Sequence, residues 1–102
     1  MEFNIAERLM LMGVMPKEGN ILTIKVVREL RQALEFSAQE LEDYGITIKG
    51  TRFEWAKDGV KEVEISAPAK DIIIKALKEL DASGKVNESQ LPLFDKFGVT
   101  GA

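Results

Sequence analysis

Carboxylates are the side chains in this sequence that come closest to a catalytic or metal-binding arrangement. Glu62 and Glu64 lie two residues apart in a segment of alternating hydrophobicity, so in a strand they project from the same face. Glu54 would lie opposite them across a predicted hairpin, and three carboxylates could then bind a divalent cation. A solvated strand face that prevents edge-to-edge association explains the same residues more simply. We therefore predict no catalytic, cofactor-binding or metal site, and no cofactor.

The residue types that the sequence lacks exclude several kinds of chemistry. Its 102 residues include no histidine and no cysteine. The usual general base, the commonest metal ligand, thiolate ligands and a cysteine nucleophile are therefore missing. The sequence also contains no glycine-rich phosphate loop and no catalytic-triad candidate. From these absences we expect a protein that is not an enzyme.

Basic side chains follow one another along a predicted helix. Lys25, Arg28 and Arg31 are spaced three residues apart on its polar side. One interpretation is a solvated face with intrahelical pairs to Glu29 and Glu35. The other is contact with phosphates or with an acidic partner.

The candidate binding face adds two lysines and the single tryptophan of the predicted hairpin to this basic stripe. Its members are Lys25, Arg28, Arg31, Lys49, Lys57 and Trp55. A tryptophan at a strand end is typical of the edge of a core, of a ligand-stacking position or of an interface. The formal net charge of −3 argues against a dedicated duplex-binding protein, which usually carries a basic surplus.

Composition and length indicate one globular domain. The sequence is 45% apolar and 30% charged, which is ordinary for a soluble protein. No apolar run approaches the roughly 18 residues of a membrane span, and the first residues do not resemble a secretory signal. We therefore expect no membrane association and a cytoplasmic location.

The longest predicted helix covers Ile21 to Leu34. Its apolar residues recur with helical periodicity, and Asn20 is a competent N-cap. A shorter helix begins after Asn4. The predicted apolar face of that helix consists of Ile5, Leu9 and Met12. Further along, Ser37 and Glu40 form a capping box at the start of a short third helix.

The apolar period changes to two after Gly45, which indicates strands. The alternation shifts phase at Gly50, so we predict a bulge or a tight turn there. A hairpin is predicted around a three-residue loop at Lys57 to Gly59, or around a five-residue loop. The apolar face that this hairpin would bury against the helices consists of Phe53, Trp55, Val63 and Ile65.

Two helices follow the predicted hairpin. The first begins after Ser66, and the second covers about Glu88 to Phe97. The sequence thus predicts a single α+β domain over residues 1–97, with about three N-terminal helices, a β-hairpin and two C-terminal helices, followed by a flexible tail over residues 98–102. A winged-helix-like topology is an alternative. Glu40, Glu42 and Asp43 would make its recognition helix acidic, which disfavours DNA binding.

Several segments resemble those of a group of uncharacterised small proteins, similar in length to this one, from phages, prophages and environmental bacteria. The resembling segments are Met15 to Asn20, Val26 to Arg31, Trp55, Asp71 to Leu80 and Leu93 to Phe97. The resemblance implies a phage-linked accessory protein that acts by binding, with no activity or cofactor attached to it.

The function predicted from the sequence is therefore a non-enzymatic protein-interaction or accessory protein of phage or bacterial origin. Its expected partner is another protein or a second copy of itself. The alternative is a winged-helix-like nucleic-acid-binding regulator, which the net charge and the acidic third helix disfavour.

Overall fold

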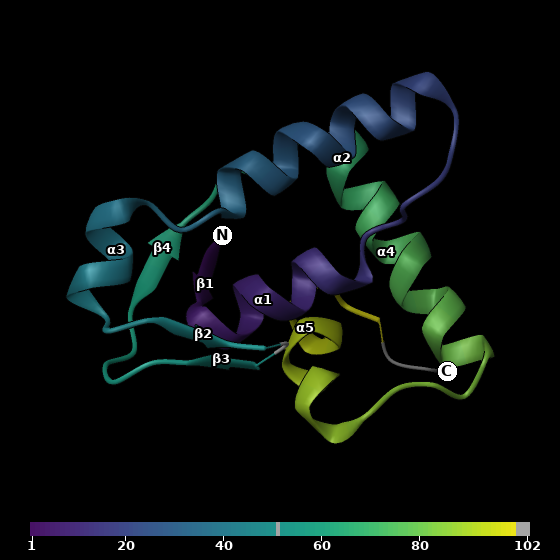
Figure 1. Cartoon of the computed structure of the whole chain (residues 1–102). Coiled ribbons are helices and arrows are strands. Elements are labelled where there is room, and N and C mark those ends of the chain that lie inside the picture. Colours follow the sequence, from purple (N-terminus) through teal and green to yellow (C-terminus); the bar gives the residue numbers. More distant parts are fainter. Residues whose placement is uncertain (51, 100–102) are drawn as a thin grey trace.

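The chain folds around one central helix. In the computed structural model, which describes residues 1–50 and 52–99, the first elements are β1 (Glu2–Asn4), α1 (Ile5–Val14), α2 (Ile21–Leu34) and α3 (Ala38–Asp43). They are followed by β2 (Thr47–Lys49), β3 (Arg52–Glu54), β4 (Val60–Glu62), α4 (Ala67–Ala82), the 3-10 helix η1 (Glu88–Gln90) and α5 (Leu91–Lys96). Helix α1 contacts β1, α2, α4 and α5, and it lies in the middle of the molecule (Figure 1).

This order of elements confirms the predicted α+β domain. Three helices, a hairpin and two further helices follow one another as the sequence indicates. The strands are short and antiparallel, with β1 paired to β4 and β2 paired to β3. The fold is therefore mainly helical, and its two small strand pairs are separate from each other.

The helices begin where the capping residues predict. Helix α2 covers Ile21–Leu34, and the Asn20 side chain accepts a hydrogen bond from the backbone N–H of Thr23 at 2.8 Å. The capping box of α3 is present in both directions, because Ser37 accepts from the Glu40 N–H while Glu40 accepts from the Ser37 N–H. Local side-chain chemistry is thus sufficient to place these helix starts.

The predicted strand pairing is wrong. The predicted loop at Lys57 to Gly59 does not close a hairpin, because β3 pairs back to β2 and β4 pairs with β1. The hairpin turn lies at Gly50, whose φ of +63° favours glycine. A very short turn between β2 and β3 closes at little entropic cost, and the N-terminal strand supplies the partner of β4.

The apolar face predicted for the hairpin is therefore not formed. Val63 is buried and belongs to the core, whereas 40% of Phe53 is exposed. Trp55, in the loop that links β3 to β4, and Ile65, after β4, are partly buried. Alternating hydrophobicity located β2 and β3, but Val63 and Ile65 lie just after β4, and its partner β1 was not predicted.

One apolar core joins the helices to β1 and to the segment after β4. Its buried members are Phe3, Leu11, Met15, Val27, Leu30, Leu34, Val63, Ala69, Ile73, Leu77, Leu93, Phe94, Phe97 and Val99. Val99 belongs to the predicted tail over residues 98–102, yet its N–H donates to the Phe94 carbonyl oxygen at 2.9 Å and its side chain is buried. The packed domain thus extends to residue 99, and residues 100–102 lie outside the described part.

The buried face of α1 also differs from the prediction. Ile5, Arg8 and Leu11 are buried, whereas the predicted Leu9 and Met12 are only partly buried. The face is rotated because an arginine takes the place of an apolar residue in the i, i+3 stripe. Arg8 has a relative exposure of 1%.

Arg8 connects α1 to the junction between α2 and α3. Its Nε donates to the Leu34 carbonyl oxygen at 3.1 Å, and its Nη2 donates to the Glu35 carbonyl oxygen at 2.7 Å. Its Nη1 forms an ion pair with Oε2 of Glu40 at 2.6 Å. The guanidinium also lies over the Phe36 ring, 4.0 Å from its centroid. The last turn of α2 and the first turn of α3 are thus bound to one buried cation.

A second charged contact holds α5 against the N-terminal segment. Lys96 forms an ion pair with Glu7 at 2.9 Å and also donates to the Glu2 carbonyl oxygen. Its ammonium lies 5.0 Å from the centroid of the Phe3 ring. Glu7 at the same time accepts from the Asn4 backbone N–H in the capping box of α1.

Arg8 lowers the pKa of Glu40. The hydrogen bond from Arg8 is the largest cause, and partial burial opposes it, while the bond from the Ser37 N–H lowers the value further. Together these effects bring the pKa of Glu40 from its ordinary 4.5 to about 2. The folded state thus favours the ionised form, and Glu40 stabilises the fold at pH values above the ordinary pKa.

We predict that Glu40→Gln lowers the free energy of unfolding by about 3 kcal/mol at neutral pH, because the buried Arg8 loses its counter-charge. The difference from the wild type should shrink as the pH falls from about 4.5 toward 2, since Glu40 becomes protonated over that interval. Urea denaturation at a series of pH values measures both effects.

Glu42→Gln is the matched control, because Glu42 is an exposed residue of the same helix and forms no ion pair within the described residues. It should change stability by less than about 0.5 kcal/mol. An equal loss for both variants, or a difference for Glu40→Gln that does not depend on pH, would contradict the assignment.

Candidate functional site

The β2–β3 hairpin has one apolar face and one charged face. Ile48 lies directly opposite Phe53, so both side chains project from the same side. Lys49 lies opposite Arg52 on the other side, where Lys49 also pairs diagonally with Glu54 at 3.3 Å. We call Ile48 and Phe53 the apolar hairpin face.

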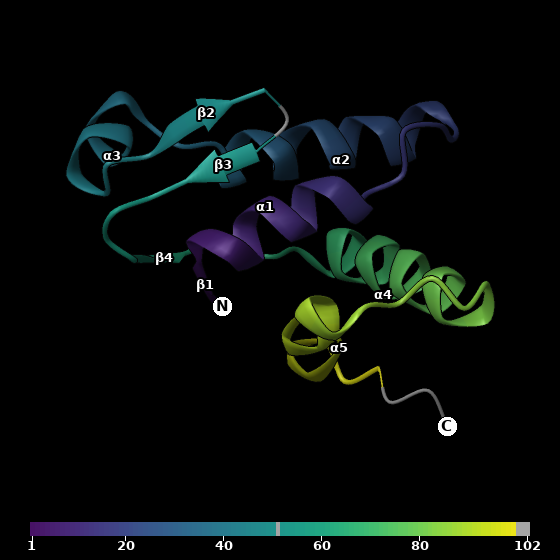
Figure 2. The same ribbon diagram turned by 60° about the horizontal axis from the view of Figure 1, so that its bottom comes forward.

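The protein itself leaves this apolar hairpin face largely uncovered. Relative exposures are 63% for Ile48 and 40% for Phe53. Neither side chain belongs to the core, and the hairpin makes few contacts with the helices. Figure 2 shows the hairpin on the side of α1 and α2 that is remote from α4 and α5. It projects as an arm from the helical body.

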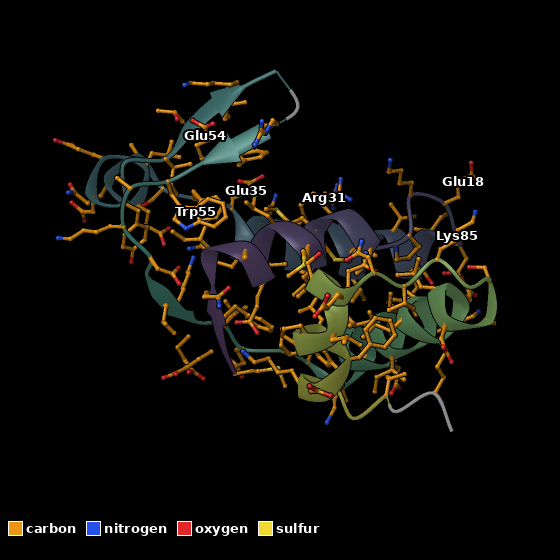
Figure 3. All side chains as sticks on the ribbon, turned by 90° about the horizontal axis from the view of Figure 1, so that it is seen from below. Glu18, Arg31, Glu35, Glu54, Trp55 and Lys85 are labelled. Atoms are coloured by element: carbon orange, nitrogen blue, oxygen red, sulfur yellow. The ribbon has the colours of Figure 1, made fainter. Side chains whose placement is uncertain are left out.

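Tyr44, which caps the C-terminus of α3, and residues of the β3–β4 loop hold the base of the arm. The Tyr44 carbonyl oxygen accepts from the backbone N–H groups of Ala56 and Lys57, at 2.9 and 3.1 Å. The Tyr44 ring lies directly against Gly59, where even a methyl group would overlap it. Trp55 is partly buried at the same base (Figure 3). The base is thus fixed to α3, and Arg8 fixes α3 to the body.

The predicted basic stripe is present and exposed. Lys25, Arg28 and Arg31 all lie at the surface of α2, and none forms an ion pair within residues 1–50 and 52–99. The intrahelical pairs of these residues with Glu29 and Glu35 are therefore not formed. Figure 3 shows Arg31 and Glu35 on the flank of α2 that faces the hairpin.

The remaining predicted site residues divide between the two ends of the arm. Lys49 lies near the tip and is paired with Glu54, whereas Lys57 lies exposed near the base. Trp55 is also at the base. The six predicted residues therefore lie in helix α2, in strand β2 and in the β3–β4 loop.

The carboxylates singled out in the sequence do not meet. Glu54 lies in β3 and Glu62 in β4, and these strands belong to different pairs. Among the described residues, no group of three or more aspartates or glutamates is arranged to bind a metal ion. Nor does any helix in that part of the chain combine the length and apolar character that crossing a membrane requires.

Sequence reasoning missed two features of this site. The first is the Ile48–Phe53 pair, which the phase shift at Gly50 could have revealed, because a two-residue turn there places these residues opposite each other. The second is Arg8, which occupies a core position of α1 between Ile5 and Leu11. A charged residue in an apolar stripe signals a buried partner elsewhere in the chain.

Comparisons with known proteins find no counterpart. No protein-family model, no curated protein and no solved structure matches the chain.

We predict that Gly59→Ala destabilises the protein by about 2 kcal/mol, because the new methyl group must displace the Tyr44 ring and the base of the hairpin with it. Chemical denaturation followed by the fluorescence of Trp55, the single tryptophan, measures the loss where it arises. In a Tyr44→Ala background, the same Gly59→Ala change should cost little.

Gly13→Ala is the matched control. The added methyl group meets no atom within 4 Å, and position 13 lies in the last turn of α1. Alanine should therefore stabilise the helix by about 0.5–1 kcal/mol. If Gly59→Ala left the stability unchanged, the position of the Tyr44 ring would not require a glycine at position 59.

Proposed function

We propose that this protein is a non-enzymatic accessory protein, of phage or bacterial origin and acting in the cytoplasm, that binds another protein through its β2–β3 hairpin. The observation that carries the proposal is the uncovered apolar hairpin face. Ile48 and Phe53 project from an arm that makes few contacts with the body.

The energetics of small hairpins support a binding role. An isolated two-stranded hairpin is at best marginally stable in water, and stability comes from packing an apolar face. The helical body does not cover this face, so a partner that buries Ile48 and Phe53 would provide the missing packing. Burial of two such side chains contributes roughly 1.5–3 kcal/mol each relative to full exposure, and less here because both are already partly covered.

The charges on the opposite face of the hairpin narrow the partner's chemistry. Lys49 and Arg52 lie side by side near the tip, and the only carboxylate among the described hairpin strands, Glu54, is paired with Lys49. A partner that contacts both faces of the arm, with apolar groups against Ile48 and Phe53 and acidic groups against Lys49 and Arg52, would complement both. The outer backbone edges of β2 and β3 also pair with no other described strand, so addition of a partner strand is a second way of docking.

Nucleic-acid binding is a second candidate function. It is favoured by one observation: Lys25, Arg28 and Arg31 are exposed and without ion pairs among the described residues. Against it stand the exposed Glu42 and Asp43 of α3, which would repel phosphates at the usual recognition position. A titration of short duplex DNA at low salt, followed by NMR, would shift the amide signals around these three cations only if this second function holds.

We predict that a photo-crosslinking amino acid at position 53 captures one dominant protein in cells that carry the gene. The same amino acid at position 60 is the control, because Val60 is also exposed, at 59%, but lies in β4 outside the arm. Ile48→Ser should abolish the crosslink from position 53, with little loss of stability because the side chain is exposed.

Equal labelling from positions 53 and 60 would show that the arm is not a binding site. Loss of binding by Ile48→Ser is interpreted only if its amide spectrum away from the hairpin matches that of the wild type. A crosslink to DNA instead of protein would favour the second candidate.

A further inference from the structure

The outward flank of α2 carries a row of exposed residues that the hairpin function does not use. Ile21 and Leu22, at its first turn, have relative exposures of 77% and 72%. Lys25, Glu29 and Gln32 continue the row along the helix, at helical spacing, and all are exposed. We call these five residues the α2 seam. In Figure 1, α2 runs along one edge of the molecule, with no other element beyond it.

The charges of the α2 seam are self-complementary. Lys25 and Glu29 are one turn apart and project within about 40° of each other around the helix axis. They do not pair with each other, and within residues 1–50 and 52–99 neither pairs with any other group. A second α2 laid antiparallel, with the two-fold axis near the level of Val27, would bring each Lys25 opposite the other copy's Glu29.

We propose that two copies of this protein associate through the α2 seam in an antiparallel, two-fold symmetric pair. The contact is isologous, so two Lys25–Glu29 ion pairs form at once. The same register places the aliphatic side chains of Ile21 and Leu22 against Gln32 and the small Ala33 of the second copy. The exposed first turn of each helix thus packs on the last turns of its counterpart.

A groove beside the seam fits this arrangement. It has a volume of about 200 Å³ and lies between α2 and the segment that leads into α4. Val26, Ala33 and Ala69 give it apolar walls, and Glu29 and Glu64 both line it. An incoming lysine would therefore meet two carboxylates, whereas an acidic or purely apolar partner would not be matched.

The experiment is sedimentation velocity over a range of concentrations, with circular dichroism as the check on folding. The wild type should show a monomer–dimer equilibrium. Lys25→Glu and Glu29→Lys, each alone, should raise the dimer dissociation constant about tenfold or more, because each places like charges opposite one another. Arg31→Glu changes the charge equally but lies on the hairpin-facing flank, so it should leave the constant within about twofold.

Mixing gives the decisive result. In a mixture of the Lys25→Glu and Glu29→Lys proteins, position 25 of each copy faces an opposite charge at position 29 of the other. The mixture should therefore form heterodimers more tightly than either variant forms homodimers. The double variant with both substitutions should dimerise like the wild type.

The proposal is overturned by a wild type that stays monomeric up to about 1 mM, which corresponds to an association free energy weaker than about −4 kcal/mol. It is equally overturned if the mixture stays monomeric, or if Arg31→Glu weakens association as much as Lys25→Glu. None of these outcomes bears on the hairpin, because the α2 seam shares no residue with it.

Discussion

The buried guanidinium of Arg8 is the contact on which the arrangement of the other elements depends. This side chain of α1 is shielded from solvent. It binds two carbonyl oxygens at the end of α2 and the carboxylate of Glu40 at the start of α3. A buried charge with so many acceptors tolerates little displacement of any of them. The orientation of α3 relative to α2 is thereby fixed. The base of the hairpin is in turn attached to α3, because the backbone of the β3–β4 loop is hydrogen-bonded to Tyr44, the residue that caps the end of α3.

Helices were predictable from the sequence because their signals are local. The cap at Asn20 and the box formed by Ser37 and Glu40 act within one turn, and the structure contains both. Strand pairing was not predictable in the same way, since β4 could pair with β3 or with the distant β1, and alternation does not distinguish them. The burial of Arg8 likewise depends on Glu40, 32 residues away in the sequence.

The candidate site was only partly predictable. Its charged residues were identified because helical spacing places Lys25, Arg28 and Arg31 on the polar side of α2, where the structure has them. The apolar hairpin face was not, because Phe53 was expected to be buried against the helices. A side chain that a protein leaves for a partner has the same sequence pattern as one that it buries itself, and only the tertiary structure separates the two cases.

The pairing of β1 with β4 has a consequence for synthesis on the ribosome. Helix α1 emerges before α4 and α5, which it contacts, and β1 emerges before its partner β4. Residues such as Phe97 and Val99 close the core only at the end. The part of the apolar surface of α1 that α4 and α5 cover therefore stays exposed until both have been made, and contact with α2 alone does not complete the core.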